Sequence, residues 1–207
     1  MSIPRFLSPV RPVKADDGEL PEAELRAAVL DGEVYQLGDG FSPSDLPSGP
    51  AERLAVVLRG RSPRLAAEGL TAAWVWGARS TAPPVLQLCC ELGHRVAKTA
   101  APDAEVRELT LQHDDLVRFG GRAVTSPLRT VVDLARDGDD GRPRADDELL
   151  SSLLVVGGIA IDDAIERLDR GRGLPGRRAA RERLRRLTSR APAGRPPRGP
   201  AIDLSRC

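Results

Sequence analysis

Apolar and polar residues follow a helical spacing in the segment 125–136, TSPLRTVVDLAR. From Leu128 onward, apolar side chains recur at i, i+3, i+4 and i+7, which is the stripe of a helix that packs against a core on one side. Ser126 is a good N-cap residue, and Pro127 fits the first helical position. The pattern therefore predicts a capped amphipathic helix in this segment.

Similar spacing predicts helices elsewhere in the chain. Their expected ranges are about 21–31, 51–59, 63–78, 147–156, 161–170 and 177–188. Trp76 lies on the apolar stripe of the third of these, so we expect it to anchor the core. Trp74 points away from that stripe and is either a contact residue or part of a second core layer.

Period-two patterns predict strands in the middle of the chain. VLQLCCEL, residues 85–92, alternates between one face with Leu86 and Leu88 and an opposite face with Gln87 and Cys89. A second strand is expected over 106–111. Around Gly120-Gly121 the sequence predicts a hairpin, and residues 33–41 predict a short β-ribbon with glycine-rich turn chemistry. Helices before and after these strands indicate an α+β fold with a mixed sheet and flanking helices on one side.

No catalytic motif is complete in the sequence. The phosphate-binding loop, the dinucleotide-binding glycine motif and the nucleophile elbow are all missing. His113, Asp114 and Asp115 form a cluster that would suit a metal-dependent enzyme, but consecutive residues in a loop rarely converge on one ion. We expect no enzyme activity, no catalytic residues, no bound metal and no cofactor.

Cysteine usage and hydropathy favour the cytoplasm. Cys89 and Cys90 are adjacent and Cys207 is the last residue, a spacing that suits neither a disulfide framework nor a zinc site, so buried free thiols are expected. No apolar run approaches the ~18–20 residues of a membrane span. The first residues also lack the continuous apolar segment of an export signal. The expected location is cytoplasmic, with no membrane partner.

Charge is distributed unevenly along the chain. Residues 171–207 contain 11 arginines and two acidic residues, whereas residues 1–170 contain 20 basic and 28 acidic residues. On the expected helix 177–188, a basic ridge could neutralise phosphates or meet an acidic protein surface. It could also be a solvated face with no binding role. The ridge consists of Arg178, Arg181 and Arg185, flanked by Arg177, Arg183 and Arg186.

Several segments together resemble a known family. RAVTSPLRTVVDLAR is similar to the signature in the middle of the AbiEi-type antitoxins, the regulatory half of type IV (abortive-infection) toxin–antitoxin systems, especially the actinobacterial members. AAEGLTAAWVWGA, VLQLCCEL, VRELTLQHDDLVRFGG and RGLPGRRAARERLRRL resemble further family segments in the same order. The similarity covers roughly residues 20–190. Its signature residues are Thr125, Ser126, Pro127, Arg129, Thr130 and Asp133.

This resemblance implies a winged-helix DNA-binding region ahead of an α/β antitoxin domain. It also implies repression of the chain's own promoter and a nucleotidyltransferase-like toxin as protein partner. Candidate DNA-binding residues are Arg177, Arg178, Arg181, Arg185 and Arg186. The expected wing, residues 36–40, contains Asp39 and no basic residue, and only about 20 residues precede the helix 21–31. These two features favour an alternative, a protein-interaction module of the same family that has lost DNA binding.

The expected organisation has three parts. Residues 1–45 form an N-terminal arm and a degenerate winged-helix-like unit, 51–190 form the AbiEi-like α/β antitoxin domain with a C-terminal helical subdomain, and 191–207 form a flexible basic tail. An exposed Arg129–Asp133 pair would contribute only ~0.2 kcal/mol. Because the resemblance rests partly on these two residues, we expect both to be partly buried and to tie their helix to the preceding hairpin. The oligomeric state is left open.

Overall fold

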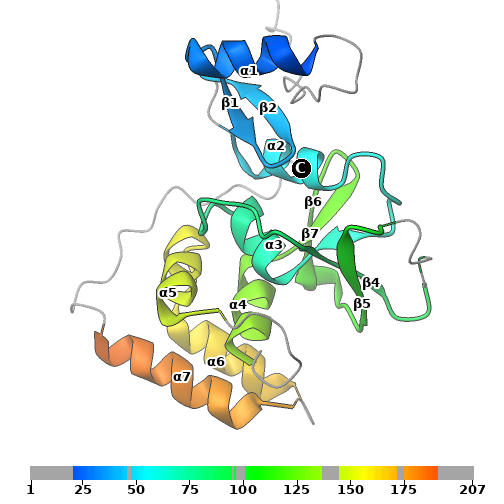
Figure 1. Cartoon of the computed structure of the whole chain (residues 1–207). Coiled ribbons are helices and arrows are strands. Elements are labelled where there is room, and N and C mark those ends of the chain that lie inside the picture. The colour runs from blue at the N-terminus through cyan, green and yellow to red at the C-terminus, as the bar shows by residue number, and fades with distance from the viewer. Residues whose placement is uncertain are drawn as a thin grey trace, which may run out of the picture.

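The computed structural model describes residues 21–45, 48–94, 96, 101–136, 145–171 and 175–190. The first 20 residues and the expected basic tail, 191–207, lie outside the described residues. The described elements, in chain order, are α1 (Glu22–Leu30), β1 (Val34–Leu37), β2 (Gly40–Pro43), α2 (Pro50–Val57), β3 (Ala66–Ala67), α3 (Gly69–Val75), β4 (Leu86–Glu91), β5 (Ala104–Leu109), the short 3₁₀ helix η3 (His113–Asp115), β6 (Leu116–Phe119), β7 (Arg122–Thr125), α4 (Pro127–Arg136), α5 (Asp147–Val156), α6 (Ile161–Arg170) and α7 (Arg177–Arg190) (Figure 1).

The chain has an α+β fold built on a mixed five-stranded sheet. Its strand order is β5-β4-β3-β7-β6. β3 pairs antiparallel with β4 and parallel with β7, β4 and β5 are parallel, and β6 and β7 form the expected antiparallel hairpin. Because β5 and β6 are opposite edges, residues 110–115 must connect one side of the sheet to the other. This connection contains η3.

One main core lies between the sheet and the helices. Leu88 and Val124 from the sheet and Leu134 from α4 are fully buried in it, together with apolar residues of every helix from α2 to α7. The opposite sheet face has only a small cluster of Ala66, Cys89 and Ala123, covered in part by leucines of β5, β6 and the connection between them. The expected placement of the helices on one side of the sheet is therefore confirmed. Within the described residues, none of the helices has the length and apolar composition needed to cross a membrane.

The expected helix 63–78 is wrong in its first third. Ala66 and Ala67 form a short central strand, and the helix begins only at Gly69. Gly69 has φ +54°, so the backbone changes direction there between strand and helix. Alanine has little preference for strands, and the pairing of β3 with β4 on one side and β7 on the other overrides that local preference.

Both tryptophans lie in the core. Trp76 follows α3, is 4% exposed, donates its indole N–H to the backbone oxygen of Thr125 (2.8 Å) and makes an edge-to-face contact with Phe119. The expected core role of Trp76 is thus confirmed. Trp74 is 2% exposed and packs beneath the guanidinium of Arg53, which decides its role in favour of a second core layer.

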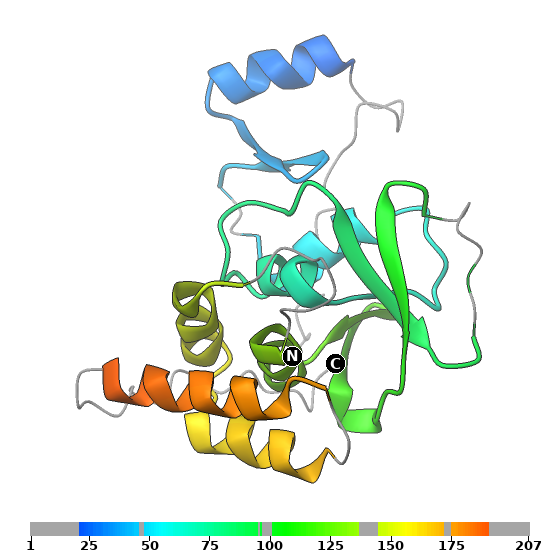
Figure 2. The ribbon, with the colours of Figure 1, turned by 60° about the horizontal axis from the view of Figure 1, so that its bottom comes forward.

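The expected ribbon near the N-terminus is also confirmed, and its turn packs on the rest of the molecule. β1 and β2 pair antiparallel from Val34–Pro43 to Leu37–Gly40. A Cβ on Gly38, in the turn, would lie 3.4 Å from both Trp74 and Val56, so this turn is in close contact with α2 and α3. Figures 1 and 2 show α1 beyond the far end of the ribbon, while α7 is at the opposite end of the molecule. α1 and α7 therefore cannot form one continuous surface.

Candidate functional site

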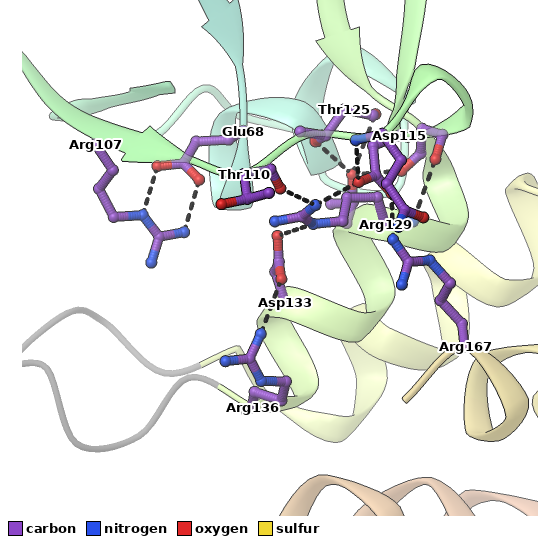
Figure 3. A network of polar contacts seen from close by, with 12 residues as sticks. Glu68, Arg107, Thr110, Asp115, Thr125, Arg129, Asp133, Arg136 and Arg167 are labelled. Atoms are coloured by element: carbon purple, nitrogen blue, oxygen red, sulfur yellow. Dashed lines mark hydrogen bonds and ion pairs between the residues drawn. The ribbon is translucent and has the colours of Figure 1, made fainter. Parts of the chain in front are cut away.

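Arg129, in the first turn of α4, lies at the centre of a network of charged side chains (Figure 3). Its Nε donates to Asp133 one turn later (2.7 Å), and its Nη1 donates to Asp115 in η3 (2.6 Å) and to the backbone oxygen of Thr110 (3.3 Å). The side chains of Arg129 and Asp133 are only 12% and 9% exposed. The expectation that both are partly buried is confirmed. The hydrogen bonds of Arg129 outside α4 go to Thr110 and Asp115, in the connection that precedes the hairpin, rather than to the expected hairpin itself.

Asp115 connects this network to the C-terminal helices. Its side chain is 2% exposed, and its second carboxylate oxygen accepts from Arg167 of α6 (2.8 Å). The backbone N–H of Gln112 donates to the carboxylate as well (3.0 Å). Burial would raise the pKa of Asp115, but the hydrogen bonds from Gln112 and Arg167 and the charge of Arg129 outweigh burial, so this pKa lies below its ordinary value.

The same balance holds on the basic side of the network. Burial disfavours the charge on Arg129, yet the carboxylates of Asp133 and Asp115 outweigh it and raise the pKa of this guanidinium. Arg136 continues the chain of contacts from Asp133 (3.3 Å) to the backbone oxygen of Pro175, just before α7. The network therefore joins the sheet, α4, α6 and the start of α7, and every charge in it is compensated by an opposite charge or a backbone group.

The remaining residues of the 125–136 signature begin α4. The Ser126 hydroxyl accepts from the Arg129 backbone N–H (3.3 Å), which is the contact expected of an N-cap. The hydroxyls of Thr125 and Thr130 lie 2.8 Å apart, and Thr130 also donates to the Ser126 backbone oxygen (2.9 Å). Thr125 and Thr130 are both 1% exposed. These contacts fix the junction between β7 and α4 and leave these two hydroxyls inaccessible to a ligand.

A second buried pair was not predicted from the sequence. Glu68, directly after β3, is fully buried and makes two hydrogen bonds with Arg107 of β5, at 2.8 and 2.6 Å. One signal was available: Glu68 is a single acid within the apolar stretch LAAEGLTAA. Its partner is 39 residues away, on a strand two positions across the sheet, so it could not be identified without the strand order.

The cluster at His113, Asp114 and Asp115 does not converge on one point. His113 and Asp114 are exposed, while Asp115 is buried and engaged by two arginines. Among the described residues no group of three histidine, cysteine or acidic side chains is arranged to hold a metal ion. Cys89 is fully buried, and burial, helped by the nearby charge of Glu68, raises the pKa of its thiol. A raised pKa makes this cysteine a poor nucleophile.

The candidate DNA-binding arginines on α7 separate into two groups. Arg177, Arg178, Arg185 and Arg186 are exposed. Arg181 is partly exposed and pairs with Asp169 of α6 at 3.4 Å, so it shares in the α6–α7 contact. Arg183, expected to flank the ridge, is 4% exposed and pairs with Asp147 of α5 (2.7 Å); it belongs to the core side of the helix. Ala180, Leu184 and Leu187 form the buried inner stripe of α7.

The molecule thus belongs to the α+β class and has two candidate sites, the buried charge network and the exposed arginine surface of α7. Comparison with protein-family models and with curated proteins finds no match. Among solved structures, the RV2827C protein from Mycobacterium tuberculosis is similar to 86% of this chain over 72% of its own length, with 17% identity and a TM-score of 0.35.

Proposed function

We propose that this chain is a non-enzymatic cytoplasmic regulator of the AbiEi antitoxin type, which binds DNA and neutralises a nucleotidyltransferase-like toxin. The observation that carries the DNA-binding part is the set of exposed arginines on α7. Arginine neutralises phosphate and binds it with two parallel hydrogen bonds, so four of them on one outer helix form an electrostatic footprint for nucleic acid. These residues are Arg177, Arg178, Arg185 and Arg186.

The buried charge network is a poor candidate for this role. Arg129 and Arg167 are 12% and 14% exposed and already bind Asp115. A phosphate would have to displace that carboxylate from the interior, at the cost of leaving it unpaired. The network therefore supports the fold, and α7 is the surface available to a ligand.

The DNA-binding part can be tested with the promoter fragment of the chain's own gene. Fluorescence anisotropy at 50 mM salt should detect binding, and the affinity should fall steeply as salt rises, because each neutralised phosphate releases counterions. A variant with all four exposed arginines of α7 changed to alanine should lose this binding while keeping the wild-type melting temperature. If the wild-type protein did not change the anisotropy of the DNA at 50 mM salt, DNA binding would be contradicted.

The antitoxin part needs a separate assay in cells. Expression of the neighbouring gene alone should arrest growth if that gene encodes the toxin, and co-expression of this chain should restore growth. The four-arginine variant should still restore growth if toxin neutralisation uses another surface. If growth stayed arrested although the wild-type protein was present in soluble form, the antitoxin assignment would be contradicted. The DNA-binding result would be unaffected.

One observation favours a second candidate, a protein-interaction module that has lost DNA binding. A wing must be free to enter or follow a groove, but here the ribbon turn containing Gly38 packs on Trp74 and Val56. The exposed residue beside it is Asp39, which repels phosphate. For this module, growth rescue would be positive while DNA affinity would be absent at 50 mM salt.

A further inference from the structure

Over residues 177–187, where the side chains of α7 are described, the exposed arginines occur as two pairs rather than as a continuous row. Arg177 and Arg178 begin the helix, and Arg185 and Arg186 follow eight residues later. With a rise of 1.5 Å per residue, the two pairs are about 12 Å apart along the helix axis. Successive side chains rotate by about 100°, so Arg178 and Arg185 project in nearly the same direction, with Arg177 and Arg186 on either side.

The middle of the same helix is not basic. Glu182 is exposed there and accepts from Arg178 (3.4 Å). Arg181, the basic residue between the pairs, is paired with Asp169 of α6. The described outer surface of α7 therefore has an arginine pair toward each end, with an acidic residue and an internally paired arginine between them.

The spacing of the two pairs is fixed by the way α7 packs. Ala180 and Leu184 are fully buried, and Arg183 bonds both the side chain of Asp147 and the backbone oxygen of Ala145. These contacts lie between the two arginine pairs, so they hold the helix at its centre and leave both basic ends facing outward. A surface ordered before binding loses little conformational entropy when a ligand arrives.

Two arginine pairs about 12 Å apart fit a duplex better than a single strand. The major groove of B-DNA is about 12 Å wide, with a phosphate backbone along each edge. A single strand running along α7 would carry its phosphates directly past the exposed carboxylate of Glu182, which repels them. We propose, on the basis of the function proposed above, that α7 lies across the major groove of B-form DNA, with one arginine pair on each backbone and Glu182 over the groove.

The test compares three probes of the same sequence and length by fluorescence anisotropy: a 24-base-pair DNA duplex, the matching RNA duplex and single-stranded DNA. The full chain should bind the DNA duplex most tightly, because A-form RNA has a narrow, deep major groove. Four phosphate contacts predict a slope of log K against log salt of about −3.6 for the duplex. Arg177→Ala with Arg178→Ala, or Arg185→Ala with Arg186→Ala, should each reduce the slope to about −1.8.

A matched control removes two exposed arginines outside α7. Arg64→Ala with Arg118→Ala changes the net charge by the same amount and should leave the slope at about −3.6. The groove-spanning arrangement would be overturned if the duplex and the single strand bound with equal affinity. It would also be overturned if one double variant alone reduced the salt slope to zero. If the duplex binds but both α7 variants behave like the control, DNA binding stands and this interface is wrong. If no probe binds, the proposed DNA-binding function fails as well.

Discussion

The structure makes a sharp prediction for Asp115→Ala. The substitution removes a carboxylate that is 2% exposed and that bonds Arg129 at 2.6 Å, Arg167 at 2.8 Å and the Gln112 backbone N–H at 3.0 Å. Removing one partner of a buried ion pair costs ~3–5 kcal/mol, since the other charge is left uncompensated. Arg129 keeps its bond to Asp133, and both arginines retain some contact with water, so we expect the lower end, about 3 kcal/mol.

Urea unfolding followed by circular dichroism measures this loss as a lower midpoint with an unchanged slope. For a chain of this size, 3 kcal/mol corresponds to a decrease in Tm of about 6–12 °C. Glu166→Ala is the matched control: it breaks an ion pair with Arg170 of equal length, 2.6 Å, in which both side chains are more than 60% exposed. Exposed pairs contribute only ~0–1 kcal/mol. Similar losses in the two variants would refute the argument that burial makes the Asp115 contacts important.

The contribution of Asp115 should also depend on pH. Its pKa is lower in the folded state than in the unfolded chain, so its stabilising effect is complete above the ordinary carboxyl value of ~4. It is lost as the pH falls toward the folded-state pKa, because protonation then favours the unfolded chain. The stability gap between wild type and Asp115→Ala should therefore narrow below pH ~4 and stay constant between pH 6 and 8.

Three further substitutions or treatments test the packing around the sheet. Gly69→Ala should lower the free energy of unfolding by at least ~2 kcal/mol in urea, because φ is +54° and the new Cβ would lie 2.2 Å from the Gln87 side-chain oxygen. An unchanged urea midpoint would contradict this geometry. Trp76→Phe should cost ~1–3 kcal/mol by the same measurement, through the lost hydrogen bond to Thr125 and the smaller ring, and an unchanged midpoint would argue against it. Cys89 should resist iodoacetamide in the native protein and react in urea, as peptide mass spectrometry would reveal; native labelling would show that the thiol is accessible.

The sequence predicted best those elements whose ends have local signals. α5 and α6 begin and end at the expected residues, 147–156 and 161–170. In α5 the Asp146 side chain accepts from the Leu149 N–H at 2.7 Å, a cap that is readable from the sequence. α4 was equally readable through Ser126 and its apolar stripe. In each case the information lies within four residues of the helix end.

Elements that depend on distant partners were predicted less well. β3 consists of two alanines within an apparent helical stripe, and only its pairing with β4 and β7 makes it a strand. The alternation in β4 was expected to separate two faces, and Gln87 and Cys89 on one face are buried as well as Leu88 on the other. A central strand is covered on both faces, and its alternation then says nothing about exposure. The Glu68–Arg107 pair was missed for the same reason.

On α7 the sequence showed the charges but not which of them are available. Arg183 was expected to flank the basic ridge and Arg185 to be part of it; Arg183 is buried against Asp147, whereas Arg185 is exposed. Helical phase places Arg183 on the side of the apolar residues Ala180, Leu184 and Leu187, and Arg185 on the other side, but the ion pair of Arg183 with Asp147 depends on the packing of the helices. The separation of the described arginines into two exposed pairs and an engaged middle therefore depends on tertiary contacts such as Arg181–Asp169.

The signature that suggests the antitoxin family has a consequence for how far the resemblance reaches. Thr125, Thr130 and Asp133 are buried, and Arg129 forms ion pairs with carboxylates within the molecule. In this chain these side chains build the junction between β7 and α4. The resemblance in 125–136 thus concerns the architecture of the chain, and the proposed regulatory function requires surfaces outside this segment. For this reason the paired arginines of α7 and the neighbouring gene are the decisive tests of function, and variants of the signature would report mainly on stability.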